Sequence, residues 1–131
     1  PSWMGRLPLH VCRHIHGTNR LEWTILTTGA DTQLRWPVAM GLHSQPPGSF
    51  TLHIDGKPRA QFDVVLDDTT WPGIEPSFRL RYQVEEANAE DSNGILLLEM
   101  PAALAPGLHR IAISGSASAS QRWFGIYESA P

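Results

Sequence analysis

The chain has 131 residues, of which 41% are hydrophobic and 18% are charged. This length fits one domain with its own core, and the composition excludes a disordered chain and a membrane-spanning one. The net charge of −3 excludes the basic surface that nucleic-acid binding requires. The single cysteine, Cys12, excludes an intrachain disulfide. We therefore expect one domain over residues 1–131, without a nucleic-acid or membrane partner. Because the chain begins with Pro instead of Met, we expect it to come from a larger multidomain protein.

Four metal-binding side chains repeat at every second position near the start: His10, Cys12, His14 and His16. In an extended strand they would point to one side, because side chains alternate between the two faces. Imidazole and thiolate together suit Zn²⁺ or copper. Four positions along one strand span too great a length to converge on one ion, so at most two or three can share it. We expect exposure or adventitious metal binding, and a small metal-dependent enzyme built on this segment is an alternative.

Two alternating patterns follow, over residues 21–25 and 34–38, and each indicates a strand with one apolar face. Trp23 and Trp36 are in phase with the inward aliphatic side chains, so we expect both in the core. Pro37 lacks a backbone N–H, which predicts that the second strand lies at a sheet edge or ends there.

The clearest local signal is a hairpin. Residues 50–54 alternate apolar and polar side chains, and Asp55-Gly56 then supplies a type I′ turn, in which both central residues need a positive φ. The pattern predicts that the returning strand directs three apolar side chains inward: Phe62, Val64 and Leu66.

Trp71 lies in a run of turn-forming residues, 67–73, where strand alternation does not account for an aromatic side chain. An indole on a loop can offer its flat face to a ligand and its N–H to a hydrogen bond. The other interpretation is a Trp folded back over the end of the fold. Asp67 and Asp68, in the same run, are candidate ligand-binding carboxylates.

Residues 78–84 alternate again, with apolar side chains on one face and Arg79, Arg81 and Gln83 on the other. Such an outward ladder is usual for a solvated face, and it also suits hydrogen bonding to hydroxyls and carboxylates. Residues 85–89 are a candidate for a short helical turn.

The segment 85–94 gathers four carboxylates and two Asn amides. Ca²⁺ requires hard oxygen ligands of this kind, although the spacing does not match an EF-hand. A solvated acidic loop, a structural Ca²⁺ site and a polar ligand-binding loop all remain open. The candidate calcium ligands are Glu90, Asp91 and Asn93, and the candidate ligand contacts are Glu86 and Asn88.

The last third of the chain predicts further strands. Residues 95–100 are apolar on both faces, which predicts a central strand covered on both sides. Residues 101–107 fit a turn with a short 3₁₀ segment, and Ile111 and Ile113 mark another strand.

The closing segment, 121–127, is an aromatic strand. Phe124 and Ile126 share one face, which we expect to be core, whereas Trp123 and Tyr127 share the other face and are either core or site.

These patterns amount to about eight short strands without a long helix. They favour an all-β, two-sheet antiparallel β-sandwich of jelly-roll type, because that arrangement buries the alternating faces against each other. An immunoglobulin-like sandwich is the alternative, but its Cys…Trp…Cys spacing is missing. The sequence has no nucleophile elbow, no H-E-x-x-H and no glycine-rich phosphate loop, so we expect binding and not catalysis.

In general type, the chain resembles the jelly-roll carbohydrate-binding modules and galactose-binding-like accessory domains attached to polysaccharide-active enzymes. The hairpin at 49–57, the loop around Trp71 and the closing strand at 121–127 carry this resemblance. It implies a non-catalytic module that binds a polysaccharide or oligosaccharide by aromatic stacking and hydrogen bonds. It also implies an extracellular or periplasmic location, a covalently attached catalytic domain and often a structural Ca²⁺.

The ligand-binding residues expected on this basis are Trp71, Asp67, Asp68, Arg79, Arg81, Glu86, Asn88, Trp123 and Tyr127. The alternative function is a structural, interdomain sandwich that packs its aromatic face on a catalytic neighbour.

Overall fold

The computed structural model describes residues 10–16, 20–42, 50–75, 77–115 and 122–129, with the backbone alone at 10–16, 42, 122–123 and 127–129. The described part contains ten β-strands and no helix. The strands are β1 (His10–His16), β2 (Arg20–Thr27), β3 (Gln33–Leu42), β4 (Phe50–Ile54), β5 (Lys57–Phe62), β6 (Thr69–Pro72), β7 (Arg79–Ala87), β8 (Asp91–Glu99), β9 (Gly107–Gly115) and β10 (Arg122–Ser129).

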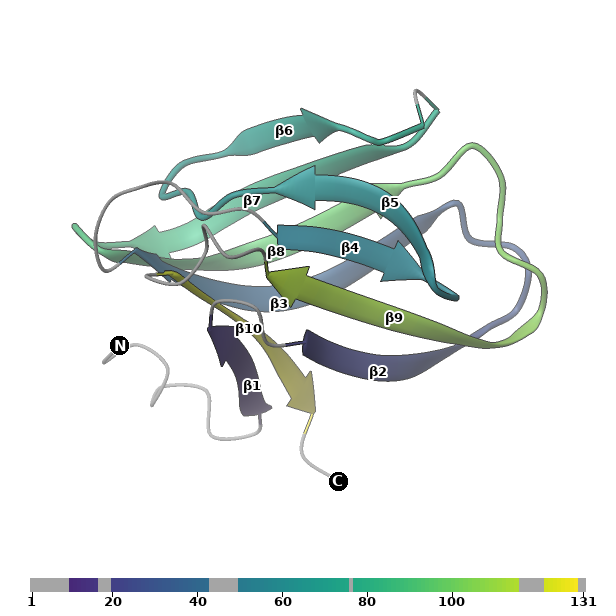
Figure 1. Cartoon of the computed structure of the whole chain (residues 1–131), viewed down its shortest axis with the longest axis horizontal. Helices are drawn as coiled ribbons and strands as arrows, with labels where there is room; N and C mark the ends of the chain where they lie inside the picture. Colours follow the sequence, from purple (N-terminus) through teal and green to yellow (C-terminus); the bar gives the residue numbers. More distant parts are fainter. Residues whose placement is uncertain (1–9, 17–19, 43–49, 76, 116–121, 130–131) are drawn as a thin grey trace.

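The strands form two antiparallel sheets that pack face to face (Figure 1). The six-stranded sheet has the order β1-β10-β3-β8-β7-β6, and the four-stranded sheet has the order β2-β9-β4-β5. Strands β1 to β4 alternate between the two sheets, as do β8 to β10. This is the jelly-roll order, with β6 and β7 added at one edge of the larger sheet. The prediction of an all-β, two-sheet jelly-roll sandwich is confirmed, and β1 and β6 are the strands beyond the eight expected.

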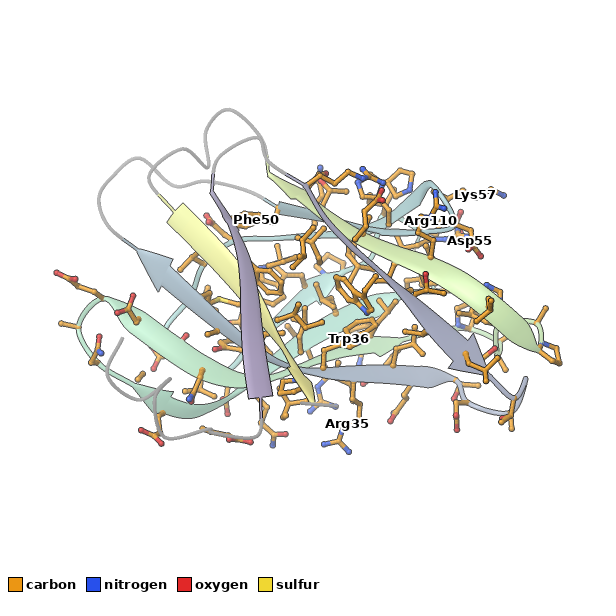
Figure 2. All side chains as sticks on the ribbon, turned by 90° about the horizontal axis from the view of Figure 1, so that it is seen from below. Arg35, Trp36, Phe50, Asp55, Lys57 and Arg110 are labelled. Atoms are coloured by element: carbon orange, nitrogen blue, oxygen red, sulfur yellow. The ribbon has the colours of Figure 1, made fainter. Side chains whose placement is uncertain are left out.

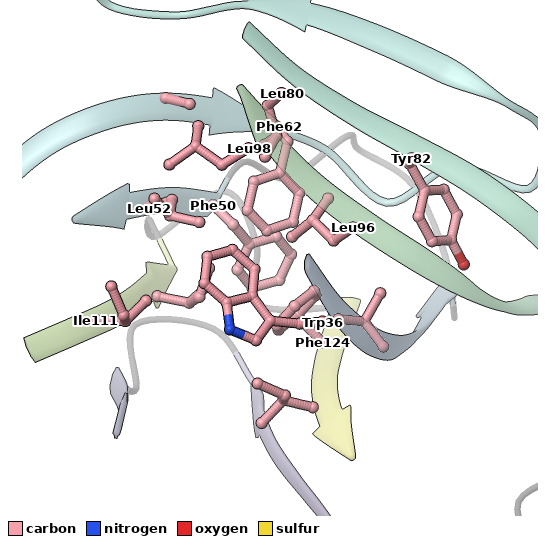
Figure 3. Packing of buried hydrophobic residues seen from close by; sticks show 14 of the residues in the cluster. Trp36, Phe50, Leu52, Phe62, Leu80, Tyr82, Leu96, Leu98, Ile111 and Phe124 are labelled. Carbon is pink, nitrogen blue, oxygen red and sulfur yellow. The ribbon is translucent and has the colours of Figure 1, made fainter. Parts of the chain in front are cut away.

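The core fills the space between the two sheets (Figure 3). Phe62 lies at the centre of an aromatic group, with its ring centroid 5.6 Å from that of Phe50 and 5.3 Å from that of Phe124. Trp36 is buried, and Trp23 packs edge-on against it, with 5.6 Å between the two ring centroids. The core positions predicted for both tryptophans are confirmed.

The predicted hairpin of β4 and β5 is also confirmed. Asp55 and Gly56 have φ values of 51° and 83°, so both central turn residues are left-handed as the type I′ turn requires.

The returning strand is shorter than predicted, because β5 ends at Phe62. The Asp63 carboxylate accepts a hydrogen bond from the backbone N–H of Val64 at 2.8 Å, which takes that donor out of the ladder. Val64 is still buried and Leu66 is half-buried, but both lie in a loop.

β3 lies inside the six-stranded sheet, which corrects the edge position predicted from Pro37. Its ladder with β8 passes through Pro37, which lies opposite Ile95. Its ladder with β10 covers only 38–42 and stops beside the proline. Pro37 is therefore tolerated at the point where the β3–β10 ladder ends, since no β10 partner needs its missing N–H.

The helical turn predicted at 85–89 is wrong, because β7 continues as a strand to Ala87. Glu86 lies opposite Asn93 on β8, so hairpin pairing overrules the helical preference of Glu and Ala. The 3₁₀ segment predicted within 101–107 is also wrong, since the chain forms bends and a loop there before β9.

β10 directs Phe124 and Ile126 into the core, as predicted. In the described part of the chain, no helix is long and apolar enough to cross a membrane.

Candidate functional site

The outward face of the six-stranded sheet brings polar and apolar side chains from four strands into rows. Arg35 on β3 lies opposite Leu97 on β8, and Leu97 lies opposite Arg81 on β7. Thr70 on β6 lies opposite Arg81 and completes the row. Arg35 points away from the sandwich, whereas Trp36, the next residue, points into it (Figure 2).

Two parallel rows flank this one. They consist of Gln33, Glu99 and Arg79 on one side and of Pro37, Ile95 and Gln83 on the other. These rows therefore present guanidinium and amide groups on β3 and β7, and the aliphatic Leu97 and Ile95 on β8 between them.

A shallow hollow of about 350 Å³ opens on this face. Ile95 and Leu97 are half-buried there, so β8 is central as predicted but is not covered on its outward side. The hollow is lined by Gln33, Arg35, Asp68, Thr69, Thr70, Arg81, Tyr82, Gln83, Ile95 and Leu97.

Positive charge predominates on the face. Arg81 Nη1 donates a hydrogen bond to Glu99 Oε1 at 3.1 Å, which orients its guanidinium. Arg35 and Arg79 are exposed and form no ion pair with any residue that the structure describes. In the three described rows, three guanidinium groups stand against the Glu99 carboxylate, and the carboxylates of Asp68 and Glu85 lie near Tyr82 at one end of the hollow.

Asp68 supports the scaffold at the rim of the hollow. Its Oδ1 accepts a hydrogen bond from the backbone N–H of Val84 at 2.7 Å, where β7 bulges before Glu86. On the other side of the bulge, Asn93 Oδ1 accepts a hydrogen bond from the N–H of Glu86 at 3.1 Å. The two side chains satisfy backbone donors at the irregularity in the ladder.

The sequence prediction for the site is met in part. Asp68 and Arg81 both line the hollow, and Arg79 lies on the same face. Asp67 is exposed in the preceding loop, where its carbonyl accepts a hydrogen bond from Thr69 Oγ1 at 2.9 Å.

Trp71 does not lie in a loop, which corrects the sequence interpretation. It belongs to strand β6 and lies opposite the buried Leu80. Its ring is partly buried against the core, 5.8 Å from that of Phe62. This placement corresponds to the second interpretation, a Trp that packs back on the sandwich.

The acidic segment forms a tight hairpin between β7 and β8. Asn88 Oδ1 accepts hydrogen bonds from the N–H groups of Glu90 and Asp91, both at 2.8 Å, so this amide oxygen closes the turn. Among the described residues, no group of three or more His, Cys, Asp or Glu side chains is placed to hold a metal. Glu90 and Asp91 lie in this hairpin and Asn93 is buried beside it, and calcium binding by these three residues stays a prediction.

The remaining predicted positions lie outside the described side chains. The segment with His10, Cys12, His14 and His16 is extended as strand β1, but its side chains are not among those described. The same holds for Trp123 and Tyr127 on β10.

Sequence reasoning missed eight residues of the hollow: Gln33, Arg35, Thr69, Thr70, Tyr82, Gln83, Ile95 and Leu97. For Arg35 and Gln83, the alternation of polar and apolar residues in the sequence does indicate an outward position. Which strands lie side by side is set by pairing across the chain, and no local pattern contains it.

No known family model matches the chain, and no curated protein matches it. Among solved structures it is similar to the CspB protease of Clostridium perfringens, with a TM-score of 0.46 and 8% identity, over 94% of this chain and 26% of that one.

Two carbohydrate-active enzymes are also similar. One is the catalytic domain of a GH87 alpha-1,3-glucanase in complex with nigerose, with a TM-score of 0.46 and 11% identity, over 90% of this chain and 22% of that one. The other is the GH115 4-O-methyl-alpha-glucuronidase BtGH115A, with a TM-score of 0.41 and 10% identity, over 92% and 14%. The chain thus spans about a quarter or less of the solved chains it resembles.

Proposed function

We propose that this domain is a non-catalytic carbohydrate-binding module that holds its ligand on the outward face of the six-stranded sheet and targets an attached catalytic domain. The observation that carries the proposal is the hollow, in which an aliphatic floor lies between polar side chains from β3, β6 and β7.

This arrangement suits a sugar, which has apolar C–H faces and hydroxyls around its edge. Ile95 and Leu97 offer the apolar contact, and Gln33 and Gln83 offer amides that both donate and accept hydrogen bonds. The face is built on paired strands, so the backbone positions that carry its polar side chains are fixed by the ladders before a ligand arrives.

The carboxylates favour binding over hydrolysis. A typical glycosidase needs two carboxyl groups beside the scissile bond. Asp68 is the single carboxylate among the described residues that line the hollow, and one of its oxygens holds the Val84 N–H.

Affinity electrophoresis in native gels with a panel of neutral and acidic polysaccharides tests the proposal. We expect at least one polymer to retard the wild type, and Gln33→Ala and Gln83→Ala to reduce that retardation. Gln61→Ala is the matched control, because Gln61 is an exposed amide on β5 of the other sheet. If no polymer retards the wild type, or if Gln61→Ala has the same effect as Gln83→Ala, the proposal is wrong.

A second function, packing on a neighbouring domain, is favoured by one observation. Leu26 on β2 and Leu108 on β9 are cross-strand partners, and they are 76% and 72% exposed. If this pair contacts the attached domain, replacing both leucines with serine will separate the melting transitions of the two domains while leaving polysaccharide retardation unchanged. Unchanged transitions would contradict it.

A further inference from the structure

We propose that the ligand of this face is an acidic saccharide, and that Arg35 and Arg81 bind the carboxylate of a uronic acid. This inference rests on the proposed carbohydrate-binding function and adds the chemical class of the ligand.

First, the charge around Leu97 favours an anionic ligand. The chain as a whole carries a net charge of −3, yet the three described rows of this face carry three arginines and one carboxylate, that of Glu99. Glu99 already accepts a hydrogen bond from Arg81, and Asp68, at the rim of the hollow, accepts one from Val84. A third carboxylate, Glu85, acts with Asp68 on Tyr82 at the far end of β7 from Arg79. The row of Arg35, Leu97 and Arg81 is therefore locally positive.

The second argument is the state of the two guanidinium groups. Arg35 is exposed and forms no ion pair within the described residues, so a ligand need not break a salt bridge to reach it. Arg81 is held by Glu99 through one nitrogen, which orients its planar group and leaves other N–H groups unused. A planar carboxylate can accept two parallel hydrogen bonds from such a fork.

The third argument is the spacing. Arg35 and Arg81 lie in one row with Leu97 between them, so their backbones are two strand spacings, roughly 10 Å, apart. A sugar ring can rest on Leu97 while its carboxylate meets a guanidinium at either side. The ring and the acid group are thus recognised together, whereas a neutral sugar offers the guanidinium groups only hydroxyls and no charged partner.

The test compares polymers that differ only in the carboxylate. Native gels contain polygalacturonate, alginate or glucuronoxylan, each beside its carboxyl-reduced neutral counterpart, and a further gel contains dextran sulfate. We expect at least one uronate polymer to retard the whole chain about tenfold more strongly than its reduced counterpart, and added salt to weaken this effect. We expect Arg35→Gln and Arg81→Gln each to weaken the retardation about tenfold. Arg110→Gln, at an exposed arginine of the other sheet, is the control and will leave it unchanged.

The outcomes separate the inference from the function on which it rests. Equal retardation by a uronate polymer and its reduced counterpart overturns the acidic class and leaves carbohydrate binding intact. The acidic class is also overturned if dextran sulfate retards the protein as strongly as the best uronate polymer does. It is overturned as well if Arg110→Gln weakens the retardation as much as Arg35→Gln does, because the attraction is then not specific to this face. Retardation by none of the polymers, neutral or acidic, overturns both.

Discussion

His109 and Asp55 join strand β9 to the tip of the β4–β5 hairpin, with 2.6 Å between His109 Nδ1 and Asp55 Oδ2. The other ring nitrogen, Nε2, lies 2.6 Å from the carbonyl oxygen of Ala105. A carboxylate and a carbonyl oxygen are both acceptors, so both ring nitrogens must donate, and only the protonated imidazolium does so. Asp55 Oδ1 also accepts a hydrogen bond from the Arg110 N–H at 2.9 Å, which completes the attachment of the hairpin.

This contact predicts a stability that depends on pH. The hydrogen bond to Asp55, followed by that to Ala105, raises the pKa of His109 above its ordinary value of 6.5. The hydrogen bond from His109 lowers the pKa of Asp55 below 3.8. The contribution of His109 to the free energy of unfolding is complete below pH 6.5 and is lost as the pH rises through its raised pKa. The contribution of Asp55 to the same free energy is lost as the pH falls through its lowered pKa. We expect urea denaturation to show His109→Gln less stable than wild type at pH 5.5, with the difference shrinking toward pH 9.

His53 provides a control of opposite sign. Burial, followed by the charge of Arg20, lowers the pKa of His53, so its contribution is present above pH 6.5 and is lost as pH falls. The difference between wild type and His53→Gln should therefore grow as pH rises from 5 to 7. A difference for His109→Gln that stays constant from pH 5.5 to 9 would show that its imidazole is not charged.

Trp71 should act on stability and not on ligand binding. Its partly buried ring packs on Phe62, so Trp71→Ala removes apolar contact and an aromatic pair, and we expect a loss of about 2 kcal/mol in the free energy of unfolding. Trp71→Phe should retain most of the stability. Native-gel retardation by the bound polysaccharide should be the same for both variants when measured well below their melting temperatures. Unchanged stability together with lost retardation would restore the stacking role that the sequence predicts.

The contrast between Trp23 and Trp71 shows what the sequence can and cannot predict about burial. Trp23 and Trp36 lie in long alternating runs, and their phase with neighbouring aliphatic residues predicts their faces. Trp71 lies in a strand of four residues bounded by turn formers, which is too short to show a period. β6 is a strand only because β7 offers it an edge, and this is a tertiary effect that local residues do not encode.

For the candidate site, the sequence predicts which side chains of a single strand point outward, but not which strands lie next to one another. The outward positions of Arg79, Arg81 and Gln83 follow from alternation in β7. Arg35 joins Arg81 because β8 lies between β3 and β7, and that order arises from the jelly-roll crossing of the chain. In the oxygen-rich segment 85–94, the side-chain oxygens of Asn88 and Asn93 accept hydrogen bonds from backbone N–H groups of a hairpin, and this structural use of the amides was not predicted from the sequence.

Gly94 should be intolerant of any side chain. A Cβ at this position would lie 2.1 Å from the carbonyl oxygen of Gln83, where the β7 bulge brings the two backbones together. Because the obstacle is backbone, Gly94→Ala must displace one strand, and we expect a loss of about 3 kcal/mol in the free energy of unfolding. Gly56→Asn is the control, since that turn position has open space and Asn tolerates its positive φ. If Gly94→Ala had the same melting temperature as the wild type, β7 and β8 would be able to move apart at little cost in free energy.

A buried hydrogen-bond chain beneath the hollow should show strong coupling between its members. The Tyr82 hydroxyl lies 2.8 Å from Ser92 Oγ, which donates to the carbonyl oxygen of Val65 at 2.8 Å, so Tyr82 must be the donor to Ser92. Burial raises the pKa of Tyr82 to about 12, which keeps this donor protonated. Tyr82→Phe removes one hydrogen bond and should cost about 1 kcal/mol in the free energy of unfolding, measured by urea denaturation.

Ser92→Ala leaves the buried Tyr82 hydroxyl and the partly buried Val65 carbonyl without this partner, so its cost should be about 2–3 kcal/mol. In the double variant the unsatisfied hydroxyl is absent, and the combined cost should fall short of the sum of the single costs by about 1 kcal/mol. These hydrogen bonds connect the loop after β5 to β7 and β8, two of the strands that carry the hollow. Both single variants should therefore weaken the attachment of that loop to the six-stranded sheet. Strictly additive costs would mean that Tyr82 and Ser92 stabilise the sandwich independently.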